Sequence, residues 1–248
     1  MACAKPSRPF DVRLQKYLAA CGFGSRRACE RLIEQGVVAV DEERVQRQGV
    51  TIDPAQNVVT VRGQVARPQS FVYVALYKPV GLLCTSRDPA GRATFHDLLP
   101  DDLPRVFSVG RLDRDSEGLL LATNDGEWAN LLQHPRHHIT KTYTVWTDRA
   151  LAPKEIEQIL AGVSEDVDVL RALSVRRLPA PRQGGRYEIV LGEGRNRHIR
   201  RMIGALDANV TRLRRTRIGN LGIKGLRPGQ WRYLTAEEVA GLVSHVGG

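Results

Sequence analysis

The segment from Gly110 to Leu121 holds the residue types best suited to chemistry. It reads Gly-Arg-Leu-Asp-Arg-Asp-Ser-Glu-Gly-Leu-Leu-Leu, so Asp113 and Asp115 lie beside two arginines, just before an apolar run. A neighbouring guanidinium keeps a carboxylate charged and fixes its orientation, which suits a nucleophile or a base that works at neutral pH. Spacing alone does not decide which aspartate reacts. The simpler interpretation of such a short stretch is a charged turn that leads into a strand.

Positive charge is concentrated toward the C-terminal end of the chain. The 248 residues have a formal net charge of +10, and eight arginines against two acidic residues fall between Glu193 and Arg217. This clustering favours a polyanionic partner. Arg197, Arg200 and Arg201 have the spacing of one helix face, which predicts a row of guanidinium groups beside an RNA groove. A solvated basic helix is the alternative for Arg197 and Arg201.

Several kinds of site are disfavoured. Gly192 and Gly194 fit neither a P-loop nor a dinucleotide-binding motif, so no nucleotide cofactor is expected. The histidines between His134 and His138 lack the co-ligands and geometry of a zinc site. The four cysteines have neither zinc nor disulfide spacing, which fits a reducing cytoplasm. The N-terminus does not resemble a secretory signal, and no run of roughly 18 apolar residues predicts a membrane span.

Helical spacing and turn residues predict a small α+β module at the N-terminal end. Apolar residues recur at helical spacing from Arg13 to Cys21, and Ser25 can cap a second helix that ends near Gln35. Short strands are expected at 37–40 and 58–61, followed by a linker at 64–70. This organisation predicts a second, larger domain from about residue 70.

The Asp113 segment is expected to lie between two strands of that larger domain. Strands are predicted at 71–77, 106–109, 119–123 and 141–145, a helix at 127–133, and a Thr-capped helix near the C-terminal end. Asp113 would then lie on a loop held at both ends by strands, where catalytic groups are common.

Several motifs resemble those of pseudouridine synthases, in the branch that modifies ribosomal RNA and carries an N-terminal S-four-type RNA-binding domain. Gly110 to Leu121 resembles the GRLDxD[ST]xGLLL motif, and Lys78-Pro79-Val80-Gly81 resembles [NY]KPxG. PRHHITKTY at 135–143 resembles PRHHxxKTY, EGRNRHIRRM at 193–202 resembles EGRNRxxRRM, and 13–40 resembles the S-four-type module. The resemblance covers residues 11 to about 240.

The resemblance implies a fold and a division into domains. The fold would be α+β, with an RNA-binding module at 10–66 and a catalytic domain at 70–244. That domain would hold a mixed, mainly antiparallel β-sheet flanked by helices.

The resemblance also implies roles for single residues. Asp113 would be the catalytic aspartate, Arg200 its partner with Arg195 in reserve, and Tyr143 would pack on the target base. Arg111 would fill the gap that the extruded uridine leaves. The RNA-binding residues would be Arg13, Lys16, Ser25, Arg26 and Arg27 in the first domain and Lys78, Arg111, Arg195, Arg197 and Arg201 in the second.

The implied function is isomerisation of uridine to pseudouridine in ribosomal RNA or a ribosome-assembly intermediate. The enzyme would be a cytoplasmic monomer that needs no cofactor and no metal. Asp113 would either attack the anomeric carbon or remove the 2′ proton, and the sequence leaves both open. EGRNR resembles enzymes of the large-subunit RNA, which is favoured, whereas PRHHITKTY resembles a small-subunit enzyme. The alternative is a non-catalytic RNA-binding assembly factor, which would bind RNA regardless of Asp113.

Overall fold

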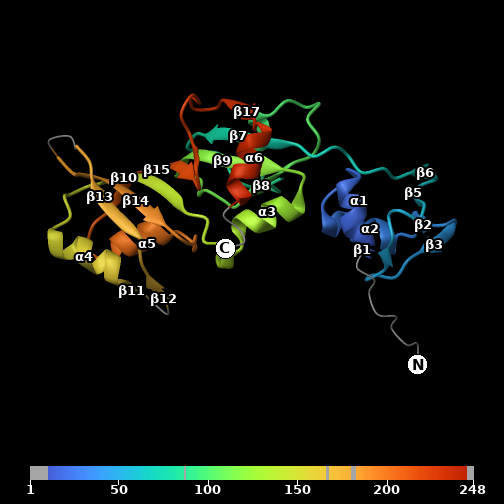
Figure 1. The fold of residues 1–248 in the computed structure, drawn as a ribbon, viewed down its shortest axis with the longest axis horizontal. Coiled ribbons are helices and arrows are strands. Elements are labelled where there is room, and N and C mark those ends of the chain that lie inside the picture. The colour runs from blue at the N-terminus through green and yellow to red at the C-terminus, as the bar shows by residue number, and fades with distance from the viewer. Residues whose placement is uncertain (1–10, 87, 166–167, 180–182, 245–248) are drawn as a thin grey trace. The chain divides into compact units, whose positions relative to one another are not determined.

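The computed structural model describes residues 11–86, 88–165, 168–179 and 183–244 (Figure 1). They divide into two compact units, with the boundary between Phe71 and Val72. None of the described helices is long and apolar enough to cross a membrane.

The first unit combines two short helices with short antiparallel strands. A sheet has the strand order β3-β2-β5-β6, and β1 pairs separately with β4. The helices are α1 (Leu14–Ala20) and α2 (Arg26–Glu34). The strands are β1 (Val12–Arg13), β2 (Val38–Val40), β3 (Glu43–Val45), β4 (Thr51–Ile52), β5 (Val59–Val61) and β6 (Gln64–Val65).

Most expected elements of this unit are present, but the linker prediction is partly wrong. The Ser25 hydroxyl accepts a hydrogen bond from Ala28 N and caps α2, as expected. Gln64–Val65, expected in the linker, pairs with β5. Ala66 is buried beside α1, and its carbonyl accepts a hydrogen bond from Tyr17 Oη at 3.0 Å. The first unit therefore extends to the buried Ala66, further than the turn-like sequence of this stretch indicates.

The second unit is built on a sheet in the order β13-β14-β10-β15-β9-β7-β17, with β8 added to β9 and β16 to β15. Among the described strands of this sheet, β9 and β15 alone pair in parallel, so the expected mixed, mainly antiparallel sheet is confirmed. The strands are β7 (Tyr73–Lys78), β8 (Phe107–Val109), β9 (Glu117–Thr123), β10 (Lys141–Thr147), β13 (Ser174–Arg177), β14 (Gly185–Leu191), β15 (Val210–Ile218), β16 (Leu221–Gly222) and β17 (Trp231–Tyr233). Outside the sheet, β11 (Val163–Glu165) pairs with β12 (Asp168–Leu170).

Helices accompany this sheet in two groups (Figure 1). The helices α3 (Gly126–Gln133) and α6 (Ala236–Val243) pack on each other near β8, with Thr235 capping α6 as expected. The helices α4 (Pro153–Ala161) and α5 (His198–Gly204) lie by β13 and β15. Two short 3-10 helices, η1 (Phe95–Leu98) and η2 (Pro135–His137), lie in the connections.

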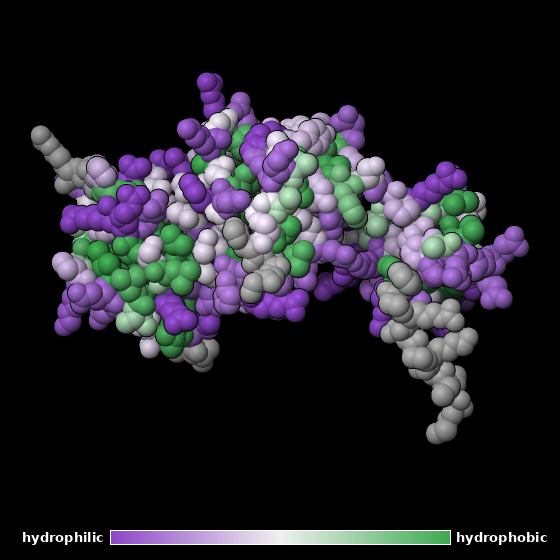
Figure 2. All heavy atoms as spheres, viewed as in Figure 1, coloured by the Kyte–Doolittle hydropathy of each residue, from purple (hydrophilic) through white to green (hydrophobic). Residues whose placement is uncertain are grey.

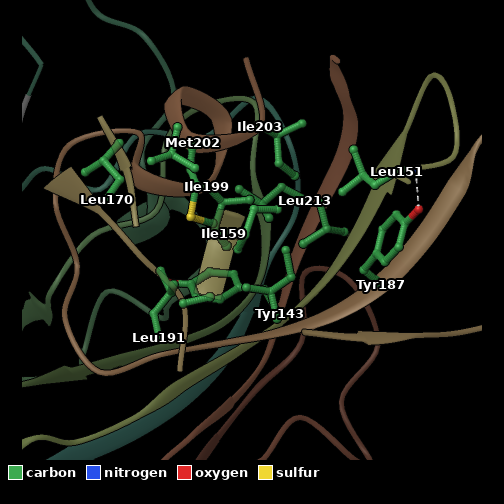
Figure 3. Packing of buried hydrophobic residues seen from close by; sticks show 14 of the residues in the cluster. Tyr143, Leu151, Ile159, Leu170, Tyr187, Leu191, Ile199, Met202, Ile203 and Leu213 are labelled. Carbon is green, nitrogen blue, oxygen red and sulfur yellow. Dashed lines mark hydrogen bonds between the residues drawn. The ribbon is translucent and has the colours of Figure 1, made fainter. Parts of the chain in front are cut away.

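A core cluster joins α5 to the strands that carry the site (Figure 3). Ile199, Met202 and Ile203 recur at helical spacing and are buried against Tyr143 and Leu213. The face of this unit seen in Figure 2 also gathers hydrophobic residues around α4 and α5. This packing fixes α5, and with it the EGRNR segment, against β10 and β15.

Candidate active site

The loop between β8 and β9 is anchored from the end of β7. Gly81 N donates to Arg114 O at 2.7 Å, and Leu112 N donates to Cys84 Sγ at 3.3 Å. At the end of the loop, Ser116 O accepts from Lys78 Nζ at 2.8 Å. The predicted arrangement, a loop held at both ends by strands, is therefore present.

Lys78 was expected to bind RNA, and the structure contradicts this. Its side chain is 0% exposed, and its ammonium donates to the carbonyls of Pro79 and Ser116. Burial lowers the pKa of Lys78. By donating to Pro79 O in the turn and to Ser116 O in the loop, the lysine ties the loop to the end of β7 and so helps to position it.

A cavity of about 350 Å³ opens beside the loop. Asp113 is the only acidic side chain among the described residues that line it, and Asp115 is not one of them. The basic lining residues are Arg111, Lys141, Arg195, Arg197 and Arg215. The apolar wall includes Leu112, Tyr143, Leu191, Ile199, Leu213 and Ile218. A single carboxylate among cations, beside an aromatic ring, suits a substrate with a phosphate backbone and a flat base.

The cation nearest Asp113 is not the expected one. Arg197 Nη1 lies 3.9 Å from Asp113 Oδ2. Arg200 instead pairs with Asp115, with its Nε 3.2 Å from Asp115 Oδ2 and its Nη2 donating to Asp115 O at 2.9 Å. The expected Arg200–Asp113 pair is therefore absent. Arg200 lies within α5 and pairs with Asp115, whereas Arg197 lies just before the helix and near both aspartates, with its Nη2 3.4 Å from Asp115 Oδ2.

The arginines of the EGRNR block do not form one row. Arg197 precedes α5 as its N-cap in a left-handed conformation, with φ of 46°, so helical spacing does not apply to it. Arg201 forms ion pairs with Glu165 and Asp168. Arg195 lines the cavity but also pairs with Asp168 and with Glu193. The predicted row of Arg197, Arg200 and Arg201 is therefore wrong, because Arg197 lies before the helix and Glu165 and Asp168 hold Arg201.

Tyr143 and Arg111, two of the expected site residues, both line the cavity. Tyr143, on β10, is 8% exposed and forms part of the cavity wall. Arg111, on the loop, is exposed and also lines the cavity.

Two cavity residues were not singled out from the sequence. Arg215 is 4% exposed, and its Nε donates to Leu119 O at 2.7 Å. Lys141 lies two residues before Tyr143, and its burial, together with the nearby Arg215, lowers the pKa of its ammonium group to about 8. Alternation along the strands could have indicated both residues, because side chains two positions apart lie on the same face of a strand. Arg215 is two residues from Leu213 on β15, and Lys141 is two residues from Tyr143 on β10.

The expected RNA-binding residues of the first unit lie on or beside β1, α1 and α2. Arg26 and Arg27 are exposed in the first turn of α2, after the capping Ser25. Arg13 lies on β1, not in the helix expected there, and its Nη1 donates to Gly49 O at 3.1 Å. Lys16 is half-buried on α1.

Comparison with known families agrees with this geometry. Residues 72–205 match the family described as RNA pseudouridylate synthase, and residues 12–58 match the S4 domain, the S-four-type module. The first match spans more than half of the chain. The chain therefore belongs to the RNA pseudouridine synthase family and carries an N-terminal S4 domain.

Relatives of similar length share both parts. An uncharacterized RNA pseudouridine synthase of Aquifex aeolicus (strain VF5) is 37% identical over 96% of each chain. The ribosomal large subunit pseudouridine synthase B of Bacillus subtilis (strain 168) is 36% identical over 93% of this chain and 95% of its own. A crystal structure of a pseudouridylate synthase is 26% identical, with a TM-score of 0.67 over 94% of this chain and 100% of that one. The protein is thus an RNA pseudouridine synthase, an isomerase.

Proposed function

We propose that this enzyme modifies large-subunit ribosomal RNA and that Asp113 is its catalytic aspartate. The observation that carries the assignment is that Asp113 is the only acid among the described residues lining the cavity. Its side chain is 33% exposed, so a substrate can reach it. Asp115, its rival by spacing, makes ion pairs with Arg200 and Arg197 and is not among the described lining residues.

The chemistry needs one carboxylate and a held base. The bond between N1 and the ribose C1′ breaks, the uracil turns, C5 bonds to C1′, C5 loses its proton and N1 gains one. Asp113 starts this reaction by attacking C1′ or by removing the 2′ proton. Tyr143 packs on the uracil, and Arg197 keeps Asp113 oriented. The remaining cavity cations bind the flanking phosphates.

The large-subunit assignment rests on relatives. Two relatives named ribosomal large subunit pseudouridine synthase B, from Bacillus subtilis (strain 168) and Vibrio vulnificus (strain CMCP6), are 36% and 38% identical to this chain. The EGRNR block supports the same substrate. The exposed arginines at the start of α2 support RNA contacts by the S4 domain as well.

The test maps pseudouridine in unmodified transcripts of both ribosomal RNAs after incubation with the purified protein. We expect carbodiimide-dependent primer-extension stops at a defined uridine of the large-subunit RNA and none in the small-subunit RNA. Stops confined to the small-subunit RNA would overturn the substrate assignment while leaving the enzyme class intact.

A further inference from the structure

Three arginines and one tryptophan stack across the strands β14, β10 and β15. Trp146 stands directly opposite Arg186 on one neighbouring strand and Arg212 on the other. Their guanidinium carbons lie 5.1 and 4.8 Å from the Trp146 ring, and that of Arg214 lies 5.5 Å away. We call these four residues the arginine–tryptophan face.

This face lies on the side of the strands opposite the cavity. Side chains alternate along a strand. Val145, Tyr187 and Leu213, each adjacent in sequence to a member of the face, are buried in the core against α4 and α5. Leu213 also lines the cavity, as does Tyr143, two residues before Val145. The arginine–tryptophan face therefore takes no part in the site described above.

The charge of the face is only partly neutralised. Arg212 and Arg214 both use Nε to contact Glu117 Oε1, at 2.6 and 3.1 Å. Among the described residues their terminal amino groups donate no hydrogen bonds, and their side chains remain 49% and 29% exposed. Three guanidinium groups thus face one carboxylate. The neighbouring Arg176 contributes no further charge because Glu188 pairs with it.

We propose that the arginine–tryptophan face is a second RNA-binding surface, which holds the sugar-phosphate backbone of the substrate RNA outside the segment that enters the cavity. The proposal rests on the proposed function, in which the substrate is a large folded ribosomal RNA. Glu117 fixes the inner edge of two guanidinium groups and leaves their outer edges to bind phosphate in the forked geometry that arginine favours. Stacking on Trp146 holds the guanidinium planes in place before RNA binds.

Charge complementarity favours RNA over a protein partner. The chain carries a net charge of +10, and its established substrate is a polyanion. A protein interface would need an exposed apolar residue at its centre. The four residues of the face offer none, because the Trp146 ring is half-buried between guanidinium groups.

The test compares a double variant, R186Q/R212Q, with a control double variant, R105Q/R227Q. The control removes the same charge from two exposed residues of the same unit. The full-length proteins are titrated with an unmodified large-subunit RNA transcript at several salt concentrations, and conversion is measured at saturating RNA. Circular dichroism melting establishes that each variant is folded.

We expect R186Q/R212Q to bind about tenfold more weakly than the control, with a slope of log affinity against log salt that is shallower by about 1 to 2. Conversion at saturating RNA should equal that of the control. Equal affinity and slope in the two variants would overturn the proposal. The proposal would also be overturned if R186Q/R212Q kept its RNA affinity but co-sedimented more weakly with large-subunit precursors, because the face would then bind a protein.

A second variant keeps the test decisive if R186Q/R212Q does not fold. R186K/R212K preserves the charge but loses the planar stack and the forked donors. Its RNA affinity should therefore be lower than that of wild type, but higher than the tenfold-reduced affinity expected for R186Q/R212Q. Wild-type affinity in this variant would refute the role of stacking. The titration measures RNA binding and does not depend on conversion. A failure of the proposed function would therefore be distinguishable from a failure of the proposed RNA-binding surface.

Discussion

Replacing Gly118 by alanine should damage both stability and activity, because this glycine is where β9 meets β15. It has a φ of +113°, and it pairs with Arg215 in the parallel ladder between β9 and β15. An added Cβ would lie 2.2 Å from Arg215 O and 2.7 Å from Arg215 N. Both neighbours are backbone atoms, so the strands themselves would have to separate.

The magnitude follows from two separate contributions. A positive φ costs a residue with a side chain about 1 to 2 kcal/mol, and forcing a methyl group into a packed interface costs about 1 to 3 kcal/mol more. We therefore expect Gly118→Ala to lower the free energy of unfolding by about 2 to 5 kcal/mol. Gly225 provides the matched control, because its φ is +88° and a Cβ there would meet nothing within 4 Å. Gly225→Ala should cost only the first contribution.

The assay is urea unfolding followed by fluorescence and circular dichroism, together with conversion of RNA at a temperature where both variants are folded. Gly118→Ala should also lose most conversion, because Arg215 lines the cavity and moves with its backbone. Gly225→Ala should convert RNA like wild type. Equal losses of stability in the two variants would refute the reasoning that the strand contact requires glycine.

Three further predictions concern buried charges. Lys78→Met should lower the free energy of unfolding by about 1 to 3 kcal/mol in urea titrations, because Pro79 O and Ser116 O lose their donor; weaker RNA binding at unchanged stability would instead restore the expected RNA-binding role. Folding lowers the pKa of Lys141 from 10.5 to about 8, so between pH 8 and 10.5 the folded state binds fewer protons at this residue than the unfolded state. The free energy of unfolding should therefore rise with pH across this range. Lys141→Met should remove that rise in unfolding experiments at different pH values. Burial alone would raise the pKa of Glu117, but hydrogen bonds from Arg212 and Arg214 hold it below its usual value of 4.5; its stabilisation is therefore present above that pH and lost as the pH falls further, and Glu117→Gln should flatten this acid limb in melting experiments.

The motifs and the repeating patterns were sufficient to predict the elements that carry the site. The strands on either side of the Asp113 loop, the strand of Tyr143 and the caps at Ser25 and Thr235 all follow from local residue preferences. The short strands β3, β4 and β6 were missed, because each holds a single apolar residue and so shows no alternation to detect.

The partners of the charged residues could not be predicted in the same way. Which carboxylate an arginine reaches depends on where its helix begins, and the left-handed Arg197 moves the start of α5 past it. Lysine is rarely buried, so nothing in the Lys-Pro turn indicated that Lys78 is fully enclosed. Spacing alone could not separate Asp113 from Asp115; the family resemblance favours Asp113, and the cavity lining supports that proposal.

The most direct test of the central claim is single-turnover conversion of large-subunit RNA by Asp113→Asn and Asp115→Asn, measured with RNA in a saturated complex. The account predicts that Asp113→Asn binds RNA and forms no pseudouridine, whereas Asp115→Asn, which weakens the ion pairs with Arg200 and Arg197, still converts the target uridine. Conversion by Asp113→Asn at the wild-type rate would contradict it.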